Sequence, residues 1–256
     1  MKRIPISWIT TPAILIAFLL AWHGYVTVFE VSKFILPPPM AVAESFIELI
    51  QDPAAHRHAW ITLYETLVGF AIATVIGVGL GTVLGKTPWL EQALNPFIIA
   101  TQVVPKVALV PLFILWFGFG PEAKIVVAAV LAFFPILTNT ILGIKSVDRG
   151  HRDVMTVMNA SRWQRFISLE FPSALPAILA GMEVGVVLSI IGAVVGEYLG
   201  GSTGLGHLAV AALNDYKVGA MFAVILLLTL MGFVLYVLVG LLKHLLIPWH
   251  ESVQRI

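Results

Sequence analysis

Residues 174–199 read ALPAILAGMEVGVVLSIIGAVVGEYL, and this stretch decides the class of fold. Its charged side chains are Glu183 and Glu197, and nearly all the others are apolar or small. A helix that crosses the hydrocarbon core of a bilayer needs about 20 mainly apolar residues. The stretch is long enough and apolar enough to meet this requirement, so it predicts a membrane-spanning helix.

Five further stretches of similar composition predict five more spans: Trp8–Phe29, Trp60–Gly85, Pro96–Phe119, Ala123–Ile144 and Val218–Leu242. The predicted fold is all-α, a polytopic membrane protein with six transmembrane helices in a single domain over residues 1–256. The first stretch is long for a signal peptide and no small-x-small cleavage motif follows it, so we interpret it as a retained span. The short turn at Gly120-Pro121 predicts a tight hairpin of the third and fourth spans.

Composition supports a bilayer as the surroundings of this chain. Hydrophobic residues make up 59% and charged residues 11%, and the mean hydropathy is +0.96. Soluble domains carry about 25% charged residues. The net charge of +1 argues against a nucleic-acid partner, which requires clustered basic surface. The chain has no cysteine, and its histidines are scattered apart from His56 and His58, so we predict no metal site.

The basic residues predict the orientation in the membrane, because cytoplasmic loops carry an excess of Lys and Arg. Ten of them fall on one face of the six-span scheme: Lys2, Arg3, Lys86, Lys145, Arg149, Arg152, Arg162, Arg165, Lys243 and Arg255. Four fall on the other face: Lys33, Arg57, Lys124 and Lys217. We therefore predict a multi-pass protein with both termini in the cytoplasm.

Two outer loops carry helical signals. Residues 41–51 place Val42, Phe46, Leu49 and Ile50 at helical spacing, which predicts an amphipathic helix at the outer membrane interface. Residues 205–213 form a short apolar run after a Gly-Ser-Thr-Gly turn and predict a second short helix.

The inner loop, residues 145–173, is the most polar part of the chain and predicts two short helices with a break between them. Asn159 tolerates the left-handed conformation that ends a helix, and Ser161 is a good N-cap for the next one. We expect Pro172 and Pro176 to end this second helix.

The second helix carries an apolar stripe and polar residues elsewhere. The stripe comprises Trp163, Phe166 and Ile167, whereas Arg162, Gln164 and Arg165 lie off it. Such a helix on a cytoplasmic loop either lies on lipid headgroups or inserts into a groove on a partner protein. The physical pattern alone leaves both alternatives open.

This loop resembles the EAA loop of binding-protein-dependent ABC transporter permeases, whose pattern is roughly E-A-A-x(3)-G-A-S followed by an aromatic residue and L-P-x-A-L-P. Asp153 stands at the Glu position, Asn159 at the Gly position, and Ala160-Ser161 at the Ala-Ser position. Residues 171–176 read FPSALP and match the end of the pattern. The two departures, Asp for Glu and Asn for Gly, keep an acidic first turn and a residue that can adopt positive φ.

The resemblance extends to other segments and is specific to the sulfonate/taurine/nitrate-type subfamily. These segments are Leu36–Pro39, Pro105–Gly118, Gly192–Glu197 and Pro248–His250. In the EAA loop, the resemblance implies that seven residues couple the chain to an ATPase: Asp153, Asn159, Ala160, Ser161, Trp163, Gln164 and Phe166.

The resemblance implies a type I ABC importer permease in the bacterial cytoplasmic (inner) membrane. Its expected partners are a cytoplasmic ABC ATPase dimer, a second permease copy that forms a homodimer, and an extracytoplasmic solute-binding protein. The permease is not itself an enzyme and holds no cofactor, because ATP and Mg²⁺ are bound by the ATPase; the sequence shows no GxxxxGK[ST] motif. The alternatives are an ion-coupled secondary transporter, which predicts inverted repeats, and a membrane-embedded enzyme, which predicts clustered catalytic side chains.

Four ionisable side chains fall within the predicted spans and are candidates for lining the pathway: Glu65, Lys106, Glu183 and Glu197. Lys106 and Glu183 lie at similar depth, so they either form an ion pair between helices or line the pathway. Glu65 lies near the outer mouth of the second span, where interfacial solvation explains it equally simply. Glu197 precedes Gly200-Gly201 and either caps the following loop or gates it.

Acidic side chains in a pathway would repel an anionic solute. Sulfonate and taurine permeases that resemble this chain often carry Arg where Glu65 and Glu183 stand, so the sequence favours a neutral or cationic solute such as a pyrimidine-like heterocycle. Two series of glycines predict close helix packing, namely Gly77, Gly79, Gly81 and Gly85 in the second span and Gly181, Gly185 and Gly192 in the fifth.

Overall fold

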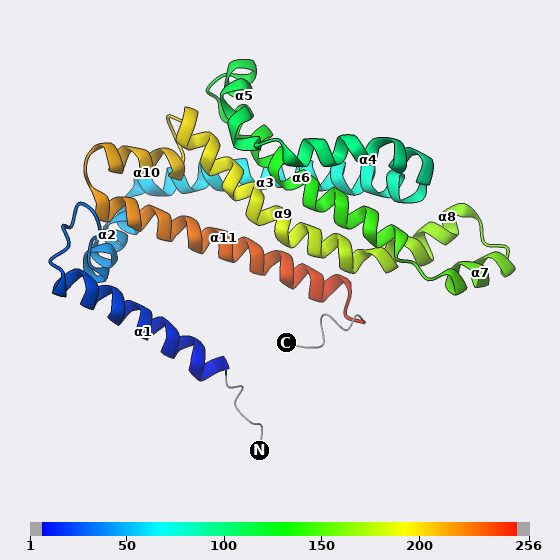
Figure 1. The fold of residues 1–256 in the computed structure, drawn as a ribbon, viewed down its shortest axis with the longest axis horizontal. Coiled ribbons are helices and arrows are strands. Elements are labelled where there is room, and N and C mark those ends of the chain that lie inside the picture. The colour runs from blue at the N-terminus through cyan, green and yellow to red at the C-terminus, as the bar shows by residue number, and fades with distance from the viewer. Residues whose placement is uncertain (1–6, 250–256) are drawn as a thin grey trace.

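The computed structural model describes residues 7–249, and within that part of the chain the regular structure is entirely helical (Figure 1). Lys2, Arg3, His250 and Arg255, which entered the sequence argument, lie outside the described residues. Five helices are long and apolar enough to cross a membrane: α1 (Ser7–Val28), α3 (Pro53–Lys86), α6 (Pro121–Lys145), α9 (Phe171–Gly200) and α11 (Val218–Leu246). They confirm five of the predicted spans, although α3 begins at Pro53, where the Asp52 side chain caps it, rather than at Trp60.

Small residues bring α3, α6 and α9 together as the core. A Cβ added at Gly81 would lie 2.6 Å from the Cβ of Thr140, and one added at Gly192 would lie 2.7 Å from the Cα of Ala128. Backbones approach this closely only where side chains are absent, which confirms the predicted role of these glycines. Gly79 is the exception, because it faces open space.

The third predicted span is not one straight helix. It consists of α4 (Pro88–Val103), the short 3₁₀ turn η1 (Lys106–Leu109) and α5 (Val110–Phe117), with a bend of 82°. Val104 is extended because it precedes Pro105, and Pro105 offers no N–H to continue the ladder. The predicted hairpin with the fourth span is therefore formed by α5, which packs on α6 after a short turn, and not by one straight helix.

This bent segment nevertheless connects opposite ends of the bundle. Glu91 in α4 pairs with Lys145 at the end of α6 at 2.8 Å. At the other end, Ile114 in α5 packs against Gly200, the last residue of α9. Counted as one span, the bent segment brings the candidate crossings to six, which matches the predicted number, while the geometry of this span differs from the prediction.

The remaining helices gather at the two ends of the long axis (Figure 1). One end, here called the α10 end, carries α2 (Pro39–Gln51) and α10 (Leu205–Asn214), which confirm the two helices predicted in the outer loops. The opposite end, the α7 end, carries α7 (Arg149–Val157) and α8 (Arg162–Arg165), and α11 ends on that side. α1 stands apart from the core and reaches it near α2 and through Trp22, whose ring lies 6.2 Å from that of Phe222.

Candidate functional site

The break between α7 and α8 has the predicted local structure. Asn159 adopts φ 55°, the left-handed conformation that ends a helix. Ser161 is the N-cap of α8, with its Oγ accepting from the Gln164 N–H at 3.2 Å while Gln164 Oε1 accepts from the Ser161 N–H at 2.8 Å. This reciprocal capping box fixes the direction in which α8 leaves the turn.

Two arginines hold this segment in a defined position. Arg152 donates to the carbonyl of Ile144 at the end of α6 at 3.0 Å, and Arg165 donates to Thr156 Oγ1 in α7 at 3.2 Å. The Asp148 side chain caps the start of α7 by accepting from the Gly150 N–H at 2.7 Å. The segment is therefore fixed to α6 and to itself, so that it can move as a unit with the spans.

An apolar ridge lies exposed on this segment. Val154, Val157, Met158 and Trp163 are 56%, 83%, 71% and 67% exposed, and together they form what we call the α7 ridge. The first three follow i, i+3, i+4 spacing, which puts them on one helix face. Sequence reasoning concentrated on α8 and missed the three residues of α7, although their spacing was readable. Asp153 lies beside them and is exposed, whereas Ala160 is half-buried.

Phe166 lies elsewhere. It is half-buried, its ring is 5.7 Å from that of Phe171, and it packs against the cluster of Ile144, Ala174 and Ile178. The predicted stripe is thus divided: Trp163 and Ile167 are exposed, and Phe166 turns into the permease. A role of Phe166 in coupling stays a prediction, and its packing favours positioning over direct contact.

Pro172 and Pro176 do not end the second helix, contrary to prediction. α8 passes through the π-helical turn η2 (Phe166–Glu170) directly into α9. The Phe171 N–H bonds to the carbonyl of Phe166, five residues earlier. Pro172 has no N–H to donate, so one backbone hydrogen bond of a regular α-helix is missing here. The wider π-helical turn accommodates this missing bond, and the helix continues.

An ion pair links this continuous helix to α3. Lys86 Nζ lies 2.6 Å from Glu170 Oε2 and 4.5 Å from the centre of the Phe166 ring. Glu170 is buried, so the pair is shielded from solvent on one side. The end of α3 is therefore tied to the point where the α7–α8 segment joins α9.

Lys106 and Glu183 do not form an ion pair, which was one of the two alternatives. Glu183 lies 3.4 Å from Lys243 in α11, while Lys106 donates to the carbonyl of Gln102 at 3.2 Å and lies 4.8 Å from the Phe134 ring centre. The bend at Pro105 places Lys106 in the 3₁₀ turn rather than in a straight span. The helix that presents a cation to Glu183 in α9 is therefore α11.

Glu65 and Glu197 are both buried, 1% and 0% exposed, and Glu197 lies against the start of α10. Thr62 donates to Glu197 Oε1 and the Gly206 N–H donates to Glu197 Oε2, both at 2.6 Å. Of the two roles considered for Glu197, the geometry supports loop capping. Interfacial solvation of Glu65 is wrong, because only 1% of the residue is exposed.

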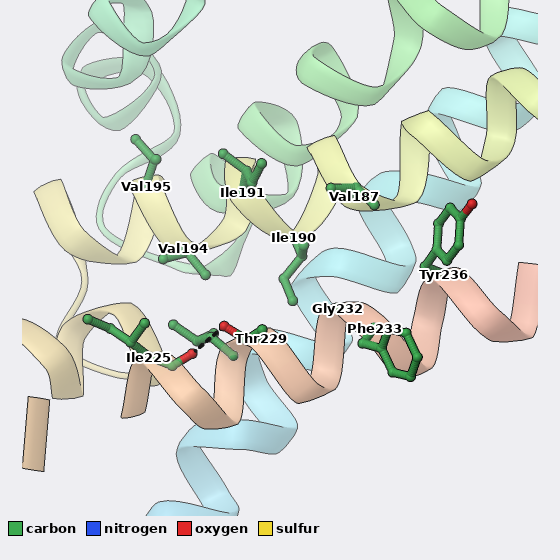
Figure 2. A pocket seen from close by; sticks show the side chains of 11 residues that line it. Val187, Ile190, Ile191, Val194, Val195, Ile225, Thr229, Gly232, Phe233 and Tyr236 are labelled. Atoms are coloured by element: carbon green, nitrogen blue, oxygen red, sulfur yellow. Dashed lines mark hydrogen bonds between the residues drawn. The ribbon is translucent and has the colours of Figure 1, made fainter. Parts of the chain in front are cut away.

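A groove with a volume of about 510 Å³ lies between α9 and α11 (Figure 2). Its lining is almost entirely apolar, and the oxygens of Thr229 and Tyr236 are its side-chain polar groups. None of the four candidate pathway residues lines it.

Residues 73–248 match the family model described as the binding-protein-dependent transport system inner membrane component. The chain belongs to this family. It is 40% identical to the riboflavin transport system permease protein RibX of Chloroflexus aurantiacus, over 94% of this chain and 90% of the relative. It is 34% identical to the formylaminopyrimidine transport permease protein ThiX of Halalkalibacterium halodurans, over 86% and 87%.

Among solved structures, an inward-facing MetNI methionine ABC transporter matches with a TM-score of 0.68 and 20% identity, over 75% of this chain and 96% of that chain. This likeness confirms the type I ABC importer permease fold. The chain is the permease subunit of an ABC importer and not an enzyme, since ATP hydrolysis belongs to a separate subunit in this family. The comparisons do not support the ion-coupled alternative.

Proposed function

We propose that this ABC importer permease couples to its ATPase through the α7 ridge. The observation that carries the proposal is the exposed apolar face of α7, on a segment that projects at one end of the bundle (Figure 1). An amphipathic helix of this kind inserts into a groove on its partner. ATP and Mg²⁺ are then bound by the ATPase, and this chain contributes the docking helix.

The path from the ridge into the spans is short. Arg152 and Arg165 fix α7 to the end of α6 and to α8, and α8 runs without a break into α9. The ion pair of Lys86 and Glu170 connects the end of α3 to the same continuous helix. Displacement of the docked segment would therefore move α3, α6 and α9, the three helices of the core.

The test is ATPase capture by permease variants in detergent without lipid. Val157→Ala with Met158→Ala should weaken binding by about 2 kcal/mol, because the truncations remove apolar groups that docking would bury, at about 0.8 kcal/mol per methylene. Val103→Ala is the matched control, since Val103 is equally exposed but lies on α4. Equal capture by the ridge variant and the control, with altered binding to vesicles instead, would show that the ridge contacts lipid headgroups.

We further propose a homodimer that receives solute from an extracytoplasmic binding protein at the α10 end. One chain supplies one docking segment, and the expected ATPase dimer presents two docking sites, so a second copy completes the complex. The family supports an ATPase and a solute-binding protein as partners. Mass determination of the purified complex tests this; a second, different permease in it would contradict the homodimer.

For the substrate we propose a nitrogen heterocycle of the flavin or pyrimidine kind. The argument from acidic pathway residues no longer supports this class, because Glu65 is buried and Glu183 is paired with Lys243. The support now comes from the riboflavin and formylaminopyrimidine relatives, which are 40% and 34% identical. Uptake into proteoliposomes holding the whole transporter, compared for riboflavin, formylaminopyrimidine and taurine, decides between heterocycle and sulfonate.

A further inference from the structure

A buried cluster of charged groups joins three core helices to α10. It consists of Glu65 in α3, Lys124 in α6 and Glu197 in α9, all nearly inaccessible to solvent. Lys124 Nζ donates to the backbone carbonyls of Phe119 and Gly120. Glu65 and Glu197 were candidates for lining the pathway, but both are buried in this structure.

The three side chains do not balance if all are charged. One lysine compensates one carboxylate, and Glu197 is the carboxylate that already accepts from Thr62 and the Gly206 N–H. Glu65 Oε2 is buried and receives no hydrogen bond from any residue that the structure describes. Glu65 lies three residues after Thr62 on the same face of α3, and Thr62 donates to Glu197, so the Glu65 carboxyl group is a near neighbour of the Glu197 carboxyl group. Two adjacent buried carboxyl groups do not both ionise readily, and a proton between them turns their repulsion into a hydrogen bond.

We propose that Glu65 and Glu197 form a proton-binding site that latches α10 over the α10 end of the core. With one proton bound, Glu65 donates to Glu197, and Glu197 holds the first turn of α10 through Gly206. Thr62 adds a second contact with the first turn of α10, because its Oγ1 also accepts from the Leu205 N–H at 2.8 Å. Loss of the proton places a second negative charge beside Glu197 and releases α10 together with the loop before it.

Other titratable and charged groups lie near the latch. One of them, His58, predicts a response to pH in the opposite direction. Glu122 in α6 interacts with Glu65, and His58 in α3 interacts with His207 in α10, with Arg57 and with Asp52. His58 Nδ1 accepts from the Gly204 N–H at 2.9 Å, so protonation of His58 would break this bond and loosen α10 as pH falls. The carboxyl pair instead loosens α10 as pH rises. The direction of the response therefore separates the two.

The experiment uses the cysteine-free chain with Ala212→Cys as a single buried reporter on α10. The rate of its reaction with a maleimide is measured from pH 5.5 to 9 in the purified transporter, with and without Glu65→Gln. The amide keeps the size of the side chain and donates to Glu197 without titrating. Leu213→Cys, the exposed neighbour on the same helix, is the control for the reagent and for thiol ionisation.

We expect the Ala212→Cys rate, divided by that of Leu213→Cys, to rise several-fold with pH in the otherwise wild-type chain. With Glu65→Gln the ratio should stay low and flat. A flat ratio without Glu65→Gln, or a ratio that increases as pH falls, overturns the proposal. If Glu65→Gln does not fold, the profile of the otherwise wild-type chain still decides. Neither ATPase docking nor the substrate enters this readout, so it is independent of the proposed function.

Discussion

Lys243 Nζ lies 3.4 Å from Glu183 Oε1, which joins the end of α11 to the middle of α9. Both side chains are largely buried, so removing one partner leaves the other without compensation in a poorly polar site. Lys243→Met should therefore destabilise the protein, and Lys243→Met with Glu183→Gln should recover part of the loss. In thermal unfolding we expect a coupling energy of about 1 kcal/mol. Lys106→Met is the control, and its effect on the free energy of unfolding should add to that of Glu183→Gln. A coupling energy between Lys106 and Glu183 would contradict the assignment of Lys243 as the partner of Glu183.

The Lys86–Glu170 ion pair should contribute more to the free energy of unfolding than the exposed Lys217–Asp215 pair. Lys86→Met leaves the buried Glu170 unpaired and removes a cation from the Phe166 ring, so we expect a loss of about 1–3 kcal/mol. Lys217→Met removes a comparable pair with Asp215, but both of those side chains are exposed. Exposed ion pairs contribute about 0–1 kcal/mol. Similar unfolding temperatures for the two variants would be evidence against a structural role for Lys86.

Gly192 and Gly79 differ in what an added side chain would meet. Gly192→Ala should cost about 1–3 kcal/mol, because the added methyl group meets the backbone of Ala128 in α6. Gly79→Ala should be neutral or stabilise by about 0.5–1 kcal/mol, since nothing lies near it and alanine favours a helix. Unfolding in detergent measures both. Equal destabilisation would mean that Gly79 meets a neighbour within the assembled transporter.

The left-handed turn at Asn159 orients α8 relative to the α7 ridge. Asn159→Ala should cost about 1–2 kcal/mol, because a Cβ residue without a polar side chain is strained at φ 55°. Asn159→Gly should keep the turn at little cost. We expect ATPase capture to fall for the alanine variant and to persist for the glycine variant. Loss in both would show that the amide itself makes the contact.

The orientation of the chain is testable with single cysteines. Lys217→Cys lies at the α10 end and should react with an impermeant thiol reagent in intact cells. Val157→Cys lies on the α7 ridge and should react only after the membrane is opened, because the positive-inside count places this end in the cytoplasm. Both positions are exposed, so access alone decides the outcome. The reverse pattern would invert the topology.

Some features of the protein were readable in the sequence because their causes are local. A stretch such as residues 174–199 spans a membrane by its own length and composition, and α9 occupies nearly these bounds. Asn159 and Ser161 end one helix and begin the next through their own backbone and side-chain chemistry, and the structure has both as predicted. Pro105 was equally visible, but the direction of the bend that it causes was not.

Only the tertiary structure decided the partners of the charged side chains. Lys106 and Glu183 have matching depths in sequence, yet the side chain beside Glu183 comes from α11, because depth does not say which helices are neighbours. Glu65 was predicted near the outer mouth of a span, yet the packing of the folded chain buries its side chain almost completely. Composition determined that this chain crosses the bilayer, since each span forms from its own residues. Helix packing determined what each buried charge meets, since that depends on residues that the sequence keeps far apart.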